Sequence, residues 1–154
     1  FWESVKYYQG TSSPINACKD DVGYSLAWQH HKGRNPHHYE YWTDRYDDGT
    51  TTIEMPYKYA AELMCDCIGA ARAYLGDKFN FVNEYKWWIN KRDNTHPKMH
   101  PNTVNFVTEV FRILAECEEQ GYYSDMLFND ELLKYCYKVS HNESELYTYK
   151  GEKL

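Results

Sequence analysis

Apolar residues recur every three or four positions along most of this chain, which is the spacing of one face of an α-helix. One such pattern opens the sequence over residues 1–8, and a second follows at Val22, Leu26 and His30. Glycine and proline interrupt helices, so we expect the second helix to end at Gly33, with a pair of histidines near its end.

The best-defined helical pattern starts near Pro56 and continues to about Gly76. Proline suits the first turn of a helix, because its missing N–H would lack a helical partner there in any case. Asp66 falls on the same stripe as Leu63 and Ala70, so the pattern places a carboxylate on an otherwise apolar helix face. A carboxylate is costly to bury there unless a cation meets it.

Three further helical patterns follow, over residues 81–90, from Pro101 to Gly121 and over 130–139. The segment 43–52, rich in Asp, Thr and Gly, is predicted to be a polar loop. No stretch shows the sustained alternation typical of strands. The sequence therefore predicts an all-α bundle that forms a single domain over residues 1–139, followed by a polar C-terminal tail over 140–154.

The charge of the chain limits the classes of partner. It has 154 residues, the size of one domain, with 17 basic and 23 acidic side chains and a net charge of −6. Broad binding to nucleic-acid backbones is therefore not expected as the main activity, and an anionic substrate would need a metal ion or local cations. Aromatic residues make up 18% of the chain, and we interpret most of them as packing residues.

The cysteines and the hydropathy indicate a cytoplasmic protein outside the membrane. Five cysteines, an odd number, are scattered without a Cys-x-x-Cys pair or a secretory signal, which favours reduced thiols. No apolar run approaches the roughly 18 residues that a membrane-spanning helix needs.

Four of the seven histidines lie within nine residues, and this density is the strongest chemical signal in the chain. Imidazole is a common metal ligand and carries protons near neutral pH. We predict His30, His31 and Asp66 as ligands of a divalent metal ion, with nitrogen and oxygen donors that fit Mn, Fe, Ni, Co or Zn. The alternative is structural: Asp66 pairs with Arg72, with Arg34 or with a buried histidine.

The second histidine pair and its basic neighbours complete the predicted site. We predict His37 or His38 as the proton donor in catalysis, while further ligand roles and simple packing against nearby aromatic rings stay open. Arg34 and Lys32 are predicted to bind a phosphate or carboxylate group of the substrate, although basic residues beside a turn are commonly plain surface.

The order of these features resembles a known class of enzymes. Residues 27–35, 54–56 and 61–66 resemble the second half of an HD-domain protein of the HD-GYP branch. In that branch a His-His pair is followed by a short turn, a loop, a helix that begins with proline and a metal-binding Asp. More closely, residues 5–10, 30–42 and 55–59 resemble a family of domain-of-unknown-function proteins found in clostridia and their phages.

The resemblance covers roughly residues 1–120 and implies a function. It implies an HD-like helical bundle whose N-terminal helices are missing here, and a metal-dependent hydrolase of a phosphate ester, such as a nucleotide. Relatives would carry a His-Asp dipeptide followed by Leu-Ser-Lys ahead of Phe1, so this chain is either shortened or has lost the chemistry. The alternatives are a non-catalytic binding or regulatory protein of phage origin with a protein partner, and a di-iron oxygenase.

Overall fold

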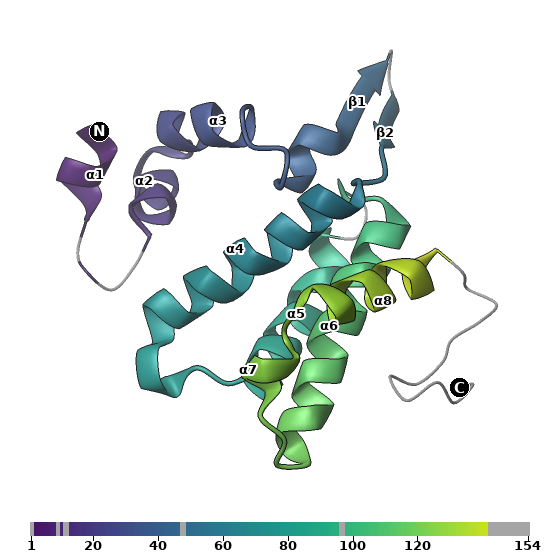
Figure 1. Ribbon diagram of the computed structural model, residues 1–154. Helices are drawn as coiled ribbons and strands as arrows, with labels where there is room; N and C mark the ends of the chain where they lie inside the picture. Colours follow the sequence, from purple (N-terminus) through teal and green to yellow (C-terminus); the bar gives the residue numbers. More distant parts are fainter. Residues whose placement is uncertain (1, 9, 11–12, 47–48, 96–97, 142–154) are drawn as a thin grey trace.

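The computed structural model describes residues 2–8, 10, 13–46, 49–95 and 98–141, and within these ranges it is helical apart from one small hairpin (Figure 1). The predicted all-α class is therefore confirmed. The elements are α1 (Trp2–Tyr7), α2 (Pro14–Val22), α3 (Leu26–Lys32), the 3-10 helix η1 (Tyr39–Trp42), β1 (Thr43–Tyr46), β2 (Gly49–Thr52), α4 (Tyr57–Leu75), the 3-10 helix η2 (Gly76–Lys78), α5 (Phe81–Thr95), α6 (Pro101–Glu119), α7 (Ser124–Leu127) and α8 (Asp130–Ser140).

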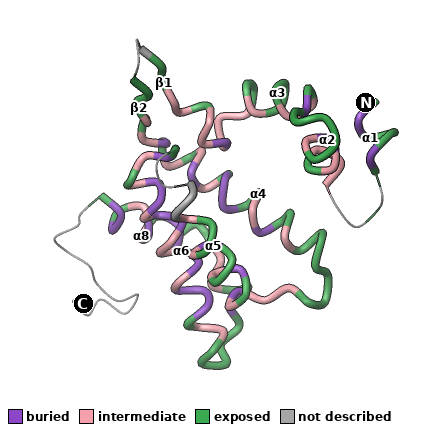
Figure 2. Tube along the Cα trace, turned by 180° about the vertical axis from the view of Figure 1, so that it is seen from behind, coloured by how far each residue is buried: buried purple, intermediate pink, exposed green. Residues whose placement is uncertain are grey.

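Helix α6 forms the centre of the bundle, with α5 and α8 packed against it (Figure 1). Apolar residues at helical spacing make it the most deeply buried helix, as the burial along the chain shows (Figure 2). Its buried residues are Thr103, Val104, Phe106, Val107, Val110, Phe111, Ile113, Leu114 and Ala115. The main core extends along the chain from Met55 to Cys136, so α4 to α8 supply it.

Helices α1 to α3 lie to one side of this bundle (Figure 1). A buried carboxylate holds them together: Glu3 of α1 accepts N–H groups from Leu26 at 2.7 Å and Ala27 at 3.2 Å, at the beginning of α3. Ser25 donates its hydroxyl to Glu3 at 2.5 Å and accepts the N–H of Trp28 at 3.0 Å. An anion at a helix N-terminus is favourable, so Glu3 fixes the start of the helix that carries the first histidine pair.

The helix predicted through Val22 and His30 is divided in two. Gly23 ends α2 with φ +82° and donates its N–H to the carbonyl of Lys19 at 2.8 Å. This left-handed conformation is easy for glycine and strained for other residues, so the chain turns there and α3 begins three residues later.

The predicted loop over 43–52 is instead a two-stranded antiparallel hairpin. Its paired residues are Thr43 with Thr52, Asp44 with Thr51, Arg45 with Thr50 and Tyr46 with Gly49. The threonines are β-branched and suit strands, but the hairpin is mostly exposed and so has no apolar alternation that would have revealed it.

Helix α4 begins and ends close to the predicted residues, but its buried face is not the predicted stripe. The buried side chains are Ala60, Leu63, Met64 and Ile68. Asp66 and Ala70 are exposed, so the expectation of a carboxylate on the apolar face is wrong. Asp66 faces solvent, where an ionised group needs no partner.

The remaining predicted helices are confirmed with small changes at their ends. Helix α5 continues to Thr95, five residues beyond the predicted end, and α8 ends at Ser140. The predicted tail over 140–154 lies outside the described residues from 142 onwards. The division into one domain and a tail stays a prediction.

Candidate metal centre

Three histidines converge where α3 ends and the chain turns back towards η1. His31, His37 and His38 each offer one ligand atom, and these three atoms all lie within 4.8 Å of one another. The ring centroids are 4.4 Å apart for His37 and His38, 4.7 Å for His31 and His38, and 6.0 Å for His31 and His37. Three imidazoles this close are a donor set that a transition-metal ion accepts.

The turn that brings the histidines together is closed by Asn35. Its side-chain amide donates to the carbonyl of His31 at 2.7 Å and lies 3.1 Å from Nδ1 of the same histidine. Its own carbonyl accepts the N–H of His38 at 3.1 Å. The indole N–H of Trp42 donates to the carbonyl of Pro36 at 2.5 Å and fixes the far side of the turn.

The environment of His38 favours the form of imidazole that binds metals. Its side chain is buried, with Trp28 in an edge-to-face contact at 4.8 Å between ring centroids. Burial is the largest cause that lowers the pKa of His38 to about 4, and the neighbouring His37 and His31 lower it further. The negative charge of Asp66 acts in the opposite direction. His38 is therefore neutral near pH 7, as a metal ligand must be.

Two buried nitrogen atoms in the cluster lack a partner. The Nε2 atoms of His37 and His38 are buried and make no hydrogen bond within the described part of the chain. A buried polar atom without a partner is unfavourable, and a bound cation is one of the recognised reasons for such an atom to persist. The donor set, its neutrality and these two atoms all fit a metal ion.

The cluster overlaps only partly with the predicted ligands. His31 belongs to it, whereas His30 and Asp66 are exposed and are not among the residues brought together here. Adjacent residues on a helix point about 100° apart, so His30 and His31 cannot easily share one ion. Asp66 on α4 still lies near enough for its charge to act on His38.

Of the structural alternatives for Asp66, the pairings with Arg72 and Arg34 are not seen among the described residues. The pairing with a buried histidine stays a prediction, since the charge of Asp66 acts on His38. Arg72 pairs with Asp125 and not with Asp66. Arg34 is exposed and Lys32 half-buried, and neither takes part in an ion pair among the described residues, so both cations beside the cluster are available to an anion.

The role of His38 as proton donor stays a prediction. Its pKa of about 4 makes the ring a neutral imidazole near pH 7, which is a weaker acid than imidazolium, and the ring lies among the other two imidazoles. The role of His37 as proton donor stays a prediction. Its position in the cluster favours a ligand role, one of the alternatives left open by the sequence.

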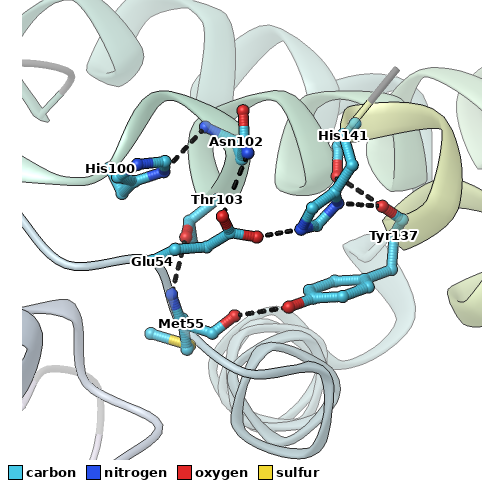
Figure 3. Close-up of polar contacts among 8 residues, drawn as sticks. Glu54, Met55, His100, Asn102, Thr103, Tyr137 and His141 are labelled. Carbon is cyan, nitrogen blue, oxygen red and sulfur yellow. Dashed lines mark hydrogen bonds and ion pairs between the residues drawn. The ribbon is translucent and has the colours of Figure 1, made fainter.

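A second polar cluster, centred on Glu54, has no counterpart in the sequence predictions (Figure 3). Glu54 pairs with Nε2 of His141 and accepts the side-chain amide of Asn102 at 3.1 Å. His141 uses its other ring nitrogen on the carbonyl of Tyr137 at 2.5 Å, and the Tyr137 hydroxyl donates to the carbonyl of Met55 at 3.0 Å. Both nitrogens of His141 are occupied, and the cluster joins the start of α4 to α6 and α8.

These residues lie far apart in the sequence, and short-range spacing gave no signal for them. His100 lies just before α6, and its Nδ1 accepts the N–H of Asn102 at 3.2 Å, so this ring caps the beginning of the helix (Figure 3).

A hollow of about 280 Å³ lies elsewhere, where α4 and α6 end, and contains none of the histidines. Arg72 on its wall stacks over Phe79, with the guanidinium carbon 4.5 Å from the ring centroid, and pairs with Asp125. The histidine cluster, not this hollow, holds the groups suited to metal chemistry.

Comparison with known families agrees with part of the sequence interpretation. Residues 3–113 match the model of a family of unknown function, DUF5662. The chain belongs to this family. The matched segment of DUF5662 includes all three clustered histidines and Asp66, and the family description says nothing of HD-domain phosphohydrolases, so that resemblance stays a prediction.

No curated protein and no solved structure matches the chain. Among the described helices, none combines the length and the apolar character that crossing a membrane requires.

Proposed function

We propose that this member of the DUF5662 family binds a divalent transition-metal ion through His31, His37 and His38 and hydrolyses a phosphate ester, such as a nucleotide. The observation that carries the proposal is the convergence of three imidazoles, two of them with buried, unpartnered Nε2 atoms. The resemblance to HD-domain hydrolases, stated from the sequence, supports the same reaction class.

Three protein ligands are typical of catalytic metal sites, because a fourth position stays open for water or substrate. When bound, a divalent ion lowers the pKa of a water and polarises a phosphoryl oxygen. Imidazole donors suit Zn, Fe, Co and Ni, and Mn remains a candidate where a carboxylate joins the set.

The surrounding residues have separate roles in this proposal. Asn35 holds the backbone of His31 and His38 by hydrogen bonds and so places their rings. Arg34 and Lys32 bind the phosphate of the substrate by charge. Asp66 acts on the cluster through its negative charge, and the HD resemblance implies that it is a further ligand.

Elemental analysis of untagged protein, purified without chelators, tests the metal part. We expect about one ion per chain in the wild type, loss of the ion in His38→Gln, and full retention in the matched control His30→Gln. A metal-free wild type, or equal retention in both variants, would contradict the proposal. Two iron ions per chain with oxygen consumption would instead favour the oxygenase alternative.

Hydrolysis is tested on the metal-loaded protein with a panel of nucleotides and p-nitrophenyl phosphate. We expect turnover that a chelator abolishes and the ion restores. Lys32→Gln and Arg34→Gln should raise KM more than they lower kcat, because these side chains bind the substrate.

A second candidate, a non-catalytic binding protein, is favoured by the exposed apolar side chains of α1 to α3. Val5 is 72% exposed, Tyr8 69% and Leu26 56%, and clusters of exposed apolar groups mark interaction sites. Metal-loaded protein with no turnover on any phosphate ester would favour this candidate.

A further inference from the structure

The hairpin of β1 and β2 has two outer edges, and its hydrogen bonds show which backbone groups face them. The N–H of Ile53 donates to the carbonyl of Trp42 at 2.7 Å, so these residues form a hydrogen-bonded pair at the base of the hairpin. Along an antiparallel ladder such pairs alternate with open pairs, whose N–H and carbonyl groups point away from the partner strand. The open pairs here are Thr43 with Thr52 and Arg45 with Thr50.

The edge of β1 is protected by its own side chains. The N–H of Arg45 points outward, and Oδ1 of Asp44 accepts it at 2.8 Å. Asp44 and Arg45 also place two charged groups on this strand, and charge on an edge strand is a common protection against pairing with another chain. A further strand is therefore not expected on the side of β1.

The edge of β2 is open. Thr50 and Thr52 point their N–H groups outward, and neither N–H has a hydrogen-bond partner in the part of the chain that the structure describes. The strand consists of one glycine and three threonines, so it has neither the charge nor the proline that usually protects an edge. Residues 49–51 are exposed, and the hairpin projects away from the helices (Figure 1). Such an edge is a template for one more strand.

This edge is complementary to itself. Two copies that pair antiparallel about a two-fold axis at Thr51 bring Thr50 of each copy opposite Thr52 of the other. These are the residues with outward backbone groups, so each pair can exchange both of its N–H groups. The strand carries no charge that would repel its copy, and threonine pairs across strands are favourable.

The same register covers an exposed apolar side chain. Ile53 directly follows β2 and is 46% exposed. In a pairing about Thr51 it lies opposite Gly49 of the other copy, and the missing side chain of that glycine leaves room for the isoleucine. A hairpin of two strands is only marginally stable by itself, so two additional strands also stabilise the sheet.

We propose that β2 pairs antiparallel with β2 of a second copy of this chain, which forms a four-stranded sheet across a two-fold axis. The self-complementary register about Thr51 favours a second copy over an unrelated extended peptide. The interface is small, so we expect a weak dimer with a Kd of about 0.1–1 mM. The contact is separate from the histidine cluster and does not depend on the proposed metal chemistry.

Sedimentation equilibrium of the intact chain, from about 10 μM to about 1 mM, tests this proposal. Thr50→Pro removes an outward N–H from each copy but no hydrogen bond of the hairpin, because Thr50 belongs to an open pair. It should weaken the dimer at least about tenfold. Arg45→Pro is the matched control, because it makes the same change in the same pair on the edge of β1, and it should dimerise as the wild type does.

Two changes at the two-fold axis test the register without removing a backbone N–H. Thr51→Lys places like charges directly opposite each other and should leave the chain monomeric. Thr51→Cys should form a disulfide-linked dimer on oxidation, because Cα atoms in an open pair lie about 4.5 Å apart, a distance that a disulfide can span. The wild type, with its exposed Cys65, gives the background of this reaction.

Three results would overturn the proposal. The first is a wild-type chain that stays monomeric at about 1 mM. The second is an equal effect of Thr50→Pro and Arg45→Pro on the dimer. The third is a dimer that Thr51→Lys does not weaken, which would place the interface elsewhere on the molecule.

Discussion

Asn35 is the residue that sets the geometry of the histidine cluster. Its side-chain amide donates to the backbone carbonyl of His31, and its backbone carbonyl accepts the N–H of His38. The density of histidines made a site predictable from the sequence. Which three converge depends on this turn, and linear spacing does not encode that, so the prediction favoured His30 over His37.

Asn35→Ala should weaken metal binding about 10- to 100-fold, because removing a group that orients a ligand typically has that effect. Zinc affinity measured by calorimetry checks this. Gln29→Ala, an exposed change on α3, is the control and should bind as the wild type does. Equal affinities for Asn35→Ala and the wild type would show that the turn does not position the ligands.

Glu84 makes stability depend on pH. Burial raises its folded-state pKa, so the folded chain keeps a proton that the unfolded chain loses. This contribution is fully present below the unfolded pKa of about 4.3 and is lost as pH rises through the folded pKa. At pH 7.5, Glu84→Gln should therefore be more stable than the wild type, because the neutral amide avoids the cost of a buried charge.

Urea denaturation at pH 4.5 and pH 7.5 measures that difference. The gain in Glu84→Gln should shrink at the lower pH, and the exposed change Glu119→Gln should show no such dependence. A gain of the same size at both pH values would rule out burial of the carboxylate as its cause.

At the scale of secondary-structure elements, the sequence predicts which segments form helices. It predicts only in part which face of each helix is buried. Helices α4, α6 and α8 begin within a residue of their predicted starts, because proline and asparagine mark them. The burial of α4 was predicted in the wrong register, since its run of small residues gives several possible stripes. The hairpin was missed because exposed threonine strands have no apolar period.

Glu3 connects α1 to α3, and replacing its charged carboxylate by a neutral amide should destabilise α3. The Ser25 hydroxyl, the largest cause, holds the pKa of Glu3 below its ordinary value, and two backbone N–H groups contribute. In Glu3→Gln we expect amide hydrogen exchange in α3 to become about tenfold faster. Glu131→Gln, in the first turn of α8, should leave α3 unchanged, and an unchanged Glu3→Gln would contradict the role of the carboxylate.

At the scale of the whole molecule, the core and the candidate site lie on different parts of the chain. The main core contains residues of α4 to α8, whereas the three histidines lie at the end of α3 and in the segment that follows it, which reaches the core through Tyr39 and Trp42. Composition could predict one helical domain. It could not predict this separation, because which helices share a core depends on long-range contacts.

Phe111 is fully buried at the centre of this core, near Trp88. Phe111→Ala should lower the free energy of unfolding by about 3–5 kcal/mol, the usual cost of a large core cavity. Chemical denaturation checks this, with Tyr123→Ala as an 82% exposed control expected to change stability by less than about 0.5 kcal/mol. A small effect of Phe111→Ala would mean that α6 is not the centre of the core.

The most direct test of the metal centre is a zinc titration followed by NMR of the histidine ring nitrogens. We expect the signals of His31, His37 and His38 to shift together and to saturate at about one equivalent of zinc, while His30 and His100 keep their signals. Shifts confined to His30 and His31, or no saturable shift in any ring, would contradict a metal centre made by the three clustered histidines.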